Sequence, residues 1–207
     1  MGSSTRALRR TRIVSTPAEP TTALQLFGEA RQIAYVVPRG TFHQHISHWA
    51  QSLGVGPWRV VERPTISNFS HRGTSGTLEF SFALAHMGAM QIEIIEQHND
   101  TPSTYNEFLE ATNGQGGLHH IAYWPDDMNI AEQQVAQLGW SLITAGELGP
   151  TGRFRYYETP NMQMHGATAP TMELAEVNGN VRNYFLTTVA ELSRTFNPHT
   201  DTVVLQK

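Results

Sequence analysis

Short runs of apolar and polar residues along the chain predict the same order of elements twice. In the first copy, residues 32–37 form a β-rich run that ends before a Pro-Arg-Gly turn. Residues 41–54 place apolar side chains at helical spacing and end on a glycine, and Thr41 and Gln44 have the spacing of a capping box. Three further strand-like runs follow, at residues 57–62, 77–85 and 90–97. The predicted order is β-α-β-β-β.

The second copy repeats this order. The string Ile-Ala-Tyr stands at 33–35 and again at 121–123, preceded by Gln32 in the first copy and by His120 in the second. A Pro-Asp-Asp turn, which is also an N-cap signal, leads into an amphipathic helical run, and three strand-like runs follow at 140–145, 153–159 and 171–177. The chain is therefore predicted to be an internal duplication with a period of 80–88 residues. We expect an α+β fold of two tandem βαβββ modules that form a cupped mixed sheet around a central cavity, with a C-terminal helix.

These patterns divide the chain into five predicted segments. They are a flexible N-terminal arm (1–28), the first module (29–98), a linker (99–116), the second module (117–178), and a C-terminal helix and tail (179–207). The linker is expected to hold one or two helical turns around residues 105–111, and the last ten residues are expected to be loose. Residues 63–76 and 145–152 are expected to be loops that shape the substrate site.

Alternation along the strands predicts which side chains face the cavity. His120 corresponds to Gln32, and its neighbour His119 should point to the opposite face. In the last strand of each module, Glu93 corresponds to Glu173. Two carboxylates in one cavity repel each other and are costly to desolvate unless a cation lies between them. Gln32, Glu93, His120 and Glu173 are therefore predicted to hold one divalent ion, with Glu93 and Glu173 as candidate catalytic bases.

Other residues are weaker candidates for substrate binding. Trp58 is a candidate wall of the pocket, although an aromatic residue after Gly-Pro also suits simple packing. Arg153, Arg155 and Tyr157 share one strand face and either contact an anionic substrate or form a solvated ladder. His86 and His165 stand at hairpin ends that could rim the cavity, and His165 is retained as a candidate substrate contact.

Composition narrows the function classes. The 207 residues carry a formal net charge of -4, which argues against a sequence-independent nucleic-acid binder, and no window approaches the length of an apolar membrane span. The chain has no cysteine, so any metal must be held by nitrogen and oxygen ligands. This absence is compatible with a reducing compartment, and we expect a cytoplasmic protein.

The motifs "QIAYVV", "LGVGPW", "MQIEIIE", "GLHHIAYWPDD" and "TMELAEV" resemble the vicinal oxygen chelate superfamily over roughly residues 30–178. This superfamily includes glyoxalase I, methylmalonyl-CoA epimerase, bleomycin resistance proteins and extradiol dioxygenases, and the "GLHHIA" and "LGVGPW" strings are most similar to its epimerase-like branch. Many members of that branch have His where this chain has Gln32. Eukaryotic glyoxalase I proteins use a Gln-Glu-His-Glu ligand set, as found at Gln32, Glu93, His120 and Glu173. The "LELTHN"-type segment of glyoxalase I is replaced here by "IEIIEQHND", which argues against a glutathione hemithioacetal substrate.

The resemblance implies a metal-dependent epimerase, isomerase or lyase that shifts a proton next to a carbonyl of a small molecule. It implies one divalent ion, from among Zn, Ni, Co, Mn and Fe, and a homodimer is expected. One alternative is an extradiol dioxygenase, which needs two histidines and one carboxylate around iron. The other alternative is a protein that binds a drug or metabolite in the same cleft without chemistry. Metal content separates the binding protein from the enzymes, and iron-dependent oxygen uptake identifies the dioxygenase.

Overall fold

The computed structural model describes residues 22–150, 152–160 and 170–205. Its strands belong to one mixed sheet: β1 (Ala30–Val36), β2 (Trp58–Glu62), β3 (Ser67–His71), β4 (Thr74–Ser75), β5 (Phe80–Met87), β6 (Met90–Gln97), β7 (Gly117–Tyr123), β8 (Ser141–Glu147), β9 (Arg153–Glu158), β10 (Thr171–Ala175) and β11 (Val204–Leu205). The helical segments are α1 (Ala23–Phe27), α2 (Phe42–Leu53), α3 (Thr104–Ala111), α4 (Met128–Gln137), α5 (Gly179–Asn183), the π-helix η1 (Tyr184–Val189) and α6 (Ala190–Thr195).

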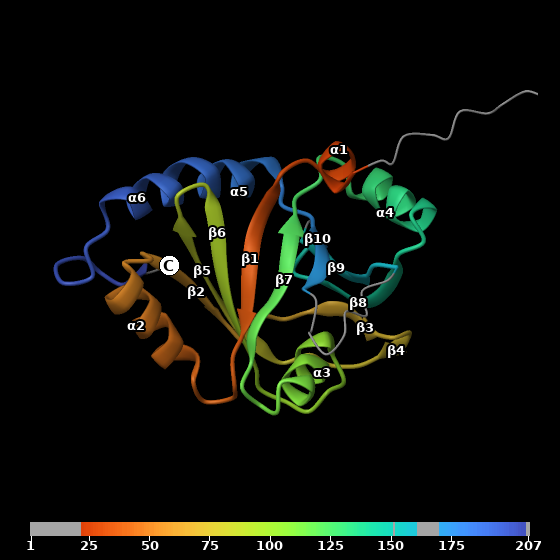
Figure 1. Cartoon of the computed structure of the whole chain (residues 1–207), viewed down its shortest axis with the longest axis horizontal. Helices are drawn as coiled ribbons and strands as arrows, with labels where there is room; N and C mark the ends of the chain where they lie inside the picture. The colour runs from red at the N-terminus through yellow and green to blue at the C-terminus, as the bar shows by residue number, and fades with distance from the viewer. Residues whose placement is uncertain (1–21, 151, 161–169, 206–207) are drawn as a thin grey trace, which may run out of the picture.

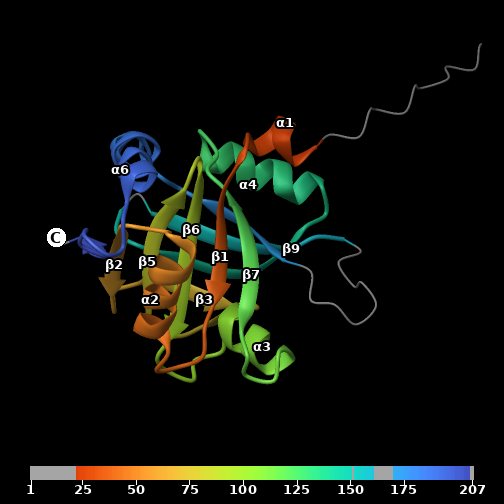
Figure 2. The same cartoon turned by 60° about the vertical axis from the view of Figure 1, so that its left-hand side comes forward.

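The sheet is built from two similar halves that meet at its centre. The first half has the strand order β2-β5-β6-β1, and the second continues as β7-β10-β9-β8. In each half the first strand runs parallel to the last, and the halves join where β1 and β7 pair antiparallel (Figure 1, Figure 2). The predicted α+β fold of two βαβββ modules with a C-terminal helix is confirmed. Both halves belong to one chain, and their inner faces together form one cup.

Helices cover the outer faces of both halves. On the first half, the apolar side of α2 packs against Trp58, Ile92 and Ile94. On the second half, α4 and α1 pack against Tyr157 and Leu174. The largest apolar cluster lies on the inner face, where α3 and η1, the middle part of the C-terminal segment α5-η1-α6, pack against it. In Figure 1 that C-terminal segment runs along one end of the cup, beside β5 and β6.

Local capping confirms one predicted helix start and corrects another. Asp127 caps α4 as expected, and its carboxylate accepts hydrogen bonds from Asn129 N and Ile130 N. The capping box predicted at Thr41 is absent. Instead, Oε2 of Glu96 accepts from the backbone N–H groups of Thr41 and Phe42, each at 2.9 Å. A buried carboxylate at a helix N-terminus satisfies two otherwise unpaired donors and interacts favourably with the helix dipole.

Three segments predicted to be irregular contain regular structure. Within the arm 1–28, Thr22 caps α1, and Phe27 is buried against Tyr123 and Trp140, so the arm is not flexible throughout. Residues 63–76 contain β3 and β4, and β3 crosses to pair with β8 of the other half. The last ten residues include β11, which pairs with β2. Among the helices of the described residues, none has the length and apolar character needed to cross a membrane.

Candidate metal centre

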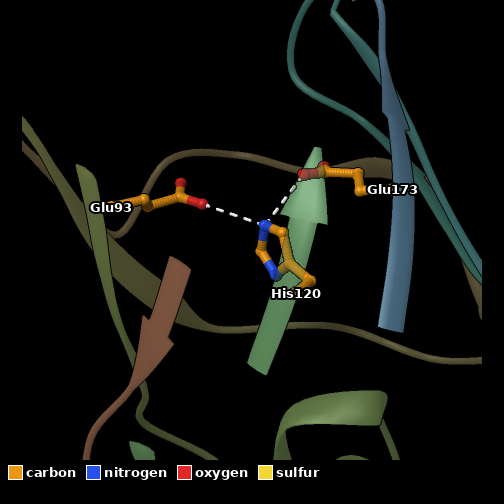
Figure 3. A group of neighbouring side chains, drawn as sticks. All are labelled: Glu93, His120 and Glu173. Carbon is orange, nitrogen blue, oxygen red and sulfur yellow. Dashed lines mark ion pairs between the residues drawn. The ribbon is translucent and has the colours of Figure 1, made fainter. Parts of the chain in front are cut away.

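Three side chains from both halves of the sheet converge on the inner face. Glu93 comes from β6, His120 from β7 and Glu173 from β10, and one potential ligand atom of each lies within 4.8 Å of the other two (Figure 3). Nε2 of His120 lies 2.9 Å from Oε2 of Glu173 and 3.5 Å from Oε2 of Glu93. Figure 3 shows both carboxylates directed at the same ring nitrogen of His120, Glu93 from the β6 side and Glu173 from the β10 side. The three are called the carboxylate–histidine trio below.

Strand register explains why residues so far apart in sequence meet. Glu93, Ala34 and His120 are neighbours in one row across β6, β1 and β7. Gln32, Ala122 and Glu173 occupy the next row, across β1, β7 and β10.

The repeated Ile-Ala-Tyr string therefore places one alanine in each row. Both alanines have no exposed surface, and each lies between two larger polar residues. A methyl side chain at each of these positions leaves room for the flanking side chains to lean toward each other. Ala34 and Ala122 form the floor of the site.

The predicted orientation of His119 is wrong. A shift in the β1–β7 register between Ala34 and Tyr35 disrupts the regular alternation of β7 at this point. Nδ1 of His119 consequently lies 2.9 Å from Nδ1 of His120, and Nε2 of His119 lies 3.1 Å from Oγ1 of Thr104. Both rings are buried. His119 is thus a neighbour of the trio in the interior and does not point to the outer face.

The donor atoms of the trio fit a divalent cation. Nε2 of His120 and Oε2 of Glu173 are buried and, despite their 2.9 Å separation, neither has a hydrogen-bond partner of acceptable geometry. Around a tetrahedral ion with bonds of about 2.0–2.2 Å, donor atoms are about 3.3–3.6 Å apart. The observed separations of 2.9 and 3.5 Å are close to this spacing. A cation at the centre would satisfy both unpartnered atoms and offset the two carboxylate charges.

Gln32 lies beside the trio and has an amide that suits the same role. Its Nε2 donates a 2.7 Å hydrogen bond to Oε1 of Gln91, and the side chain is buried. Because the amide nitrogen is engaged, the carbonyl oxygen is the atom left to face a cation. Gln32 lines the same cavity as Glu93 and Glu173.

Burial and neighbouring charges shift the pKa values of several groups in the site. Burial on its own lowers the pKa of His120. The carboxylates of Glu173 and Glu93 outweigh that effect and raise the pKa to about 9. Burial raises the pKa of Glu93, and the neighbouring His120 offsets part of that rise. Burial holds the pKa of His119 well below its usual range, and the charge of His120 lowers it further. His119 is therefore neutral, and His120 carries the proton of the pair.

A cavity of about 250 Å³ opens in front of the trio. Its walls are mainly apolar and aromatic, from β5, β9 and η1, and include Phe80, Phe82, Phe154 and Phe185. Such a pocket, apolar with a few converging polar groups, is typical of small-molecule sites. It lies on the same inner face as the carboxylate–histidine trio.

Two tyrosines supply neutral hydroxyl groups in this cavity. Oη of Tyr105 lies 2.8 Å from Oη of Tyr156, and the ring of Tyr156 is 5.0 Å from that of His120. Burial raises the pKa of both hydroxyls well above the usual value, and the carboxylates of Glu93 and Glu173 raise it further. In such a pair one hydroxyl donates to the other, whose own proton remains available to a bound ligand.

The residues predicted to bind substrate have mixed placements. Arg153 lines the cavity, but its guanidinium is held by Glu176 through hydrogen bonds of 2.8 and 3.1 Å. Trp58 and Tyr157 are buried in the clusters under the outer helices, so the prediction that they contact substrate in the cavity is corrected. Arg155 is paired with Glu132 of α4 at 3.0 Å, away from the cavity. His165 lies outside the described residues.

Sequence reasoning missed the cavity face of β9. Register pairs Glu173 with Tyr156 and Met172 with Tyr157, so Tyr156 shares the inner face with the trio. The motif "RFRYYE" contains the signal, since Phe154 and Tyr156 alternate as aromatic residues. Selecting that face required the β9–β10 register, which the sequence alone does not give.

A family model for the glyoxalase/bleomycin resistance protein/dioxygenase superfamily matches residues 31–157. The protein belongs to this superfamily. It is also known as the vicinal oxygen chelate superfamily, whose members generally bind a divalent metal, and the trio is the group in this chain that could hold one.

Several solved structures are similar to the chain at low sequence identity. A methylmalonyl-CoA epimerase from Mycobacterium tuberculosis is 15% identical with a TM-score of 0.50, and the match covers 76% of this chain and 93% of that one. A hypothetical protein from Bacillus halodurans is 16% identical with a TM-score of 0.49, covering 72% and 94%. Another methylmalonyl-CoA epimerase is 17% identical with a TM-score of 0.46, covering 72% and 94%. No curated protein sequence matches the chain.

Proposed function

We propose that this vicinal oxygen chelate protein is a divalent-metal-dependent enzyme that transfers a proton at a carbon next to a carbonyl, as an epimerase, isomerase or lyase does. The proposal is carried by one observation: two buried carboxylates, from β6 and β10, converge on one nitrogen of a single imidazole beside an aromatic cavity. The substrate is a small molecule with two neighbouring oxygen atoms. Gln32, Glu93, His120 and Glu173 are the proposed ligands.

A divalent ion held by these four residues would supply Lewis-acid stabilisation of negative charge on the substrate oxygens. His120 has only Nε2 to offer, because its Nδ1 is engaged by His119. The tyrosine pair can donate a hydrogen bond to an oxygen that gains charge. Apolar walls exclude water and strengthen each of these electrostatic interactions.

Proton transfer is assigned to the carboxylates of Glu93 and Glu173. One carboxylate accepts the proton as the C–H bond breaks, and the electron pair moves toward the carbonyl oxygen. A carboxylic acid then returns a proton to carbon and restores the original charge. Glu93 and Glu173 reach the same nitrogen of His120 from different strands, so one can accept a proton while the other, when protonated, returns one. Two such carboxyl groups suit an epimerase in particular.

The ligand set argues against the extradiol dioxygenase alternative. Those enzymes use two histidines and one carboxylate for iron, whereas the trio has one histidine and two carboxylates. A second imidazole, that of His119, is close by, but its Nδ1 is occupied by His120. A binding protein without chemistry would not need two buried carboxylates, whose desolvation is costly.

Exchange of substrate protons with solvent tests the proposal directly. The parent protein, reconstituted with Zn, Ni, Co or Mn, is incubated in D₂O with methylmalonyl-CoA and with other 2-substituted thioesters and 2-hydroxy ketones. Loss of the proton signal by NMR is expected for at least one substrate. The rate should fall at least about a hundredfold in Glu93→Gln or Glu173→Gln, as expected when a general base is removed.

Glu110→Gln is the matched control, because it removes an exposed carboxylate of α3. Its exchange rate should match that of the parent. Metal-loaded parent protein that exchanges none of these substrates, or trio variants that exchange as fast as the parent, would contradict the proposed chemistry.

A further inference from the structure

A line of polar side chains extends from the trio toward one end of the cup. Register places His86 of β5 directly opposite Gln91 of β6, and Gln91 beside Gln32 of β1. The same row continues through Ala122 to Glu173. His86 and Gln91 therefore lie on the inner face, in the row that already contains two of the proposed ligands.

His86 and Gln91 are buried but not satisfied. Each is only 1% exposed. Neither ring nitrogen of His86, nor Nε2 of Gln91, has a hydrogen-bond partner of acceptable geometry, whereas Oε1 of Gln91 accepts from Gln32. The backbone of Gly88 interacts with the His86 ring and offsets part of the lowering of its pKa by burial. Buried polar atoms are nearly always paired, so adjacent unpaired donors indicate a missing partner with oxygen atoms. The proposed metal ligands do not account for these three nitrogens.

The unsatisfied pair is next to the substrate cavity. Gln91 lines that cavity together with Glu93 and Glu173. The ring of His86 stacks on Phe185 of η1 at 6.3 Å, and Phe185 also lines the cavity. Gln91 is two residues from Glu93 along β6, which separates their Cα atoms by about 6.7 Å. A short substrate bound at the trio can span that distance.

An arginine without an ion pair gives this end of the row a positive charge. Along β2, Trp58 and Val60 pack in the outer cluster and Val61 in the inner one, so Arg59 faces inward. Arg59 is opposite Leu84, two residues from His86 on the same face. Each of the other arginines in the described ranges has a carboxylate partner.

Arg59 instead lies over the ring of Tyr184, 5.9 Å from its centroid. Tyr184 immediately precedes Phe185, so the guanidinium and the His86 ring are both covered by η1. A positive charge beside unpaired N–H donors favours a ligand group with negative oxygens.

We infer that His86 and Gln91, in the field of Arg59, form a second subsite that binds a carboxylate of the substrate, remote from the two oxygens presented to the trio. The substrate class is then a short-chain acid with a chelating carbonyl end and a carboxylate at its other end. This inference rests on the proposed function, because the first end is held at the metal site.

Paired hydroxamates test the subsite without knowledge of the natural substrate. A hydroxamate chelates divalent ions through two neighbouring oxygens. Isothermal titration of cobalt-loaded protein compares alkyl hydroxamates with ω-carboxy hydroxamates of equal chain length. The carboxylate series should bind at least about tenfold more tightly at one chain length, with about three to five methylene groups, and should lose this preference in shorter chains.

Variants locate the preference. In His86→Leu the ratio of the two affinities should fall close to one, and Arg59→Met should reduce it partially. The Asn side chain replaces only part of the N–H donation of His86. In His86→Asn the affinity ratio should therefore lie between the values of His86→Leu and the parent. Metal content and melting temperature identify any variant that fails to fold. The ratio of the two hydroxamate affinities, measured on one preparation, does not depend on the fraction of active protein.

The outcomes separate the two proposals. Equal affinity of both series at every length overturns the subsite alone and means that water pairs the buried nitrogens. A carboxylate preference that persists in both His86→Leu and Arg59→Met also overturns it. If the protein binds no metal, or neither series, the proposed function fails and the subsite falls with it.

Discussion

Nδ1 of His119 lies 2.9 Å from Nδ1 of His120, and this contact fixes which nitrogen of His120 faces the cavity. One of the two atoms must carry a proton. With Nδ1–H of His120 as donor, His119 accepts at Nδ1 and donates from Nε2 to Oγ1 of Thr104. Nε2 of His120 is then free of a proton and can bind a cation. Metal-bound histidines typically have such a partner on the other ring nitrogen.

Replacing His119 should therefore weaken metal binding without removing a ligand. We expect His119→Phe to lower the affinity for Zn or Co about 10- to 100-fold, which is the usual effect of losing an orienting partner. Competition with a chromophoric chelator measures this affinity. His48→Ala on the exposed side of α2 is the control and should retain the parent affinity. A parental affinity in His119→Phe would mean that His119 only fills space.

The alanine floor provides a test that leaves every proposed ligand intact. Ala122→Leu adds bulk between Gln32 and Glu173, where no surface is exposed. We expect the bound metal to be lost, together with about 1–3 kcal/mol of stability from overpacking. Metal analysis and urea unfolding check the two effects. Ala136→Val, on an exposed helical position, should change neither. Full metal content in Ala122→Leu would contradict the placement of the ion above this floor.

Metal affinity should depend on pH through His120. Its pKa is about 9 in the metal-free protein, so a proton must leave before the imidazole can bind a cation. We expect the apparent affinity to rise from pH 6.5 to 9, by up to about tenfold per pH unit, and to level off above. The stability of the protein without added metal should change with pH in the opposite direction. Because the raised pKa stabilises the fold fully below 6.5, that contribution should be lost as pH rises through 9.

Glu173→Gln removes part of the charge that raises this pKa. The metal-free variant should therefore show a smaller loss of stability between pH 6.5 and 9. Thermal unfolding across this range is the measurement. An unchanged profile in Glu173→Gln would show that the carboxylate does not interact with the protonated imidazole.

Glu96 lies on the same strand as Glu93 and should behave differently when altered. Glu96→Gln weakens the acceptor for Thr41 N and Phe42 N, and we expect a loss of about 1–3 kcal/mol. For a chain of this size that lowers the melting temperature by about 2–12 °C. Metal content should stay at the parental level. Metal loss in Glu96→Gln, in a folded protein, would argue against a purely structural role.

Much of the fold was predictable because the duplication makes its signal redundant. The repeated Ile-Ala-Tyr string marks the central strands, and alternation in β5 and β6 identifies their inner faces. The pairing of β3 with β8 could not be predicted, since it depends on a contact between the two halves. The capping of α2 by Glu96 is likewise a long-range contact that replaced the local capping box.

Alternation also explains which parts of the site were predictable. It assigns Glu93, His120 and Glu173 to inner faces, and the structure brings them together. It failed at His119, because a register shift breaks the two-residue period. For β9 the two-residue period does not tell which face of the strand points into the cavity. The register with β10 places Tyr156, and not Tyr157, on that face. The unpaired His86 became evident only from burial and hydrogen bonding.

Metal content of the purified protein tests the central claim most directly. Elemental analysis compares the parent with a variant that carries both His120→Ala and Glu173→Ala, each after dialysis against a mixture of divalent ions. We predict about one ion per parent chain and essentially none in a folded double variant. If the parent binds no divalent ion under these conditions, or if the double variant retains it, the carboxylate–histidine trio is not a metal centre.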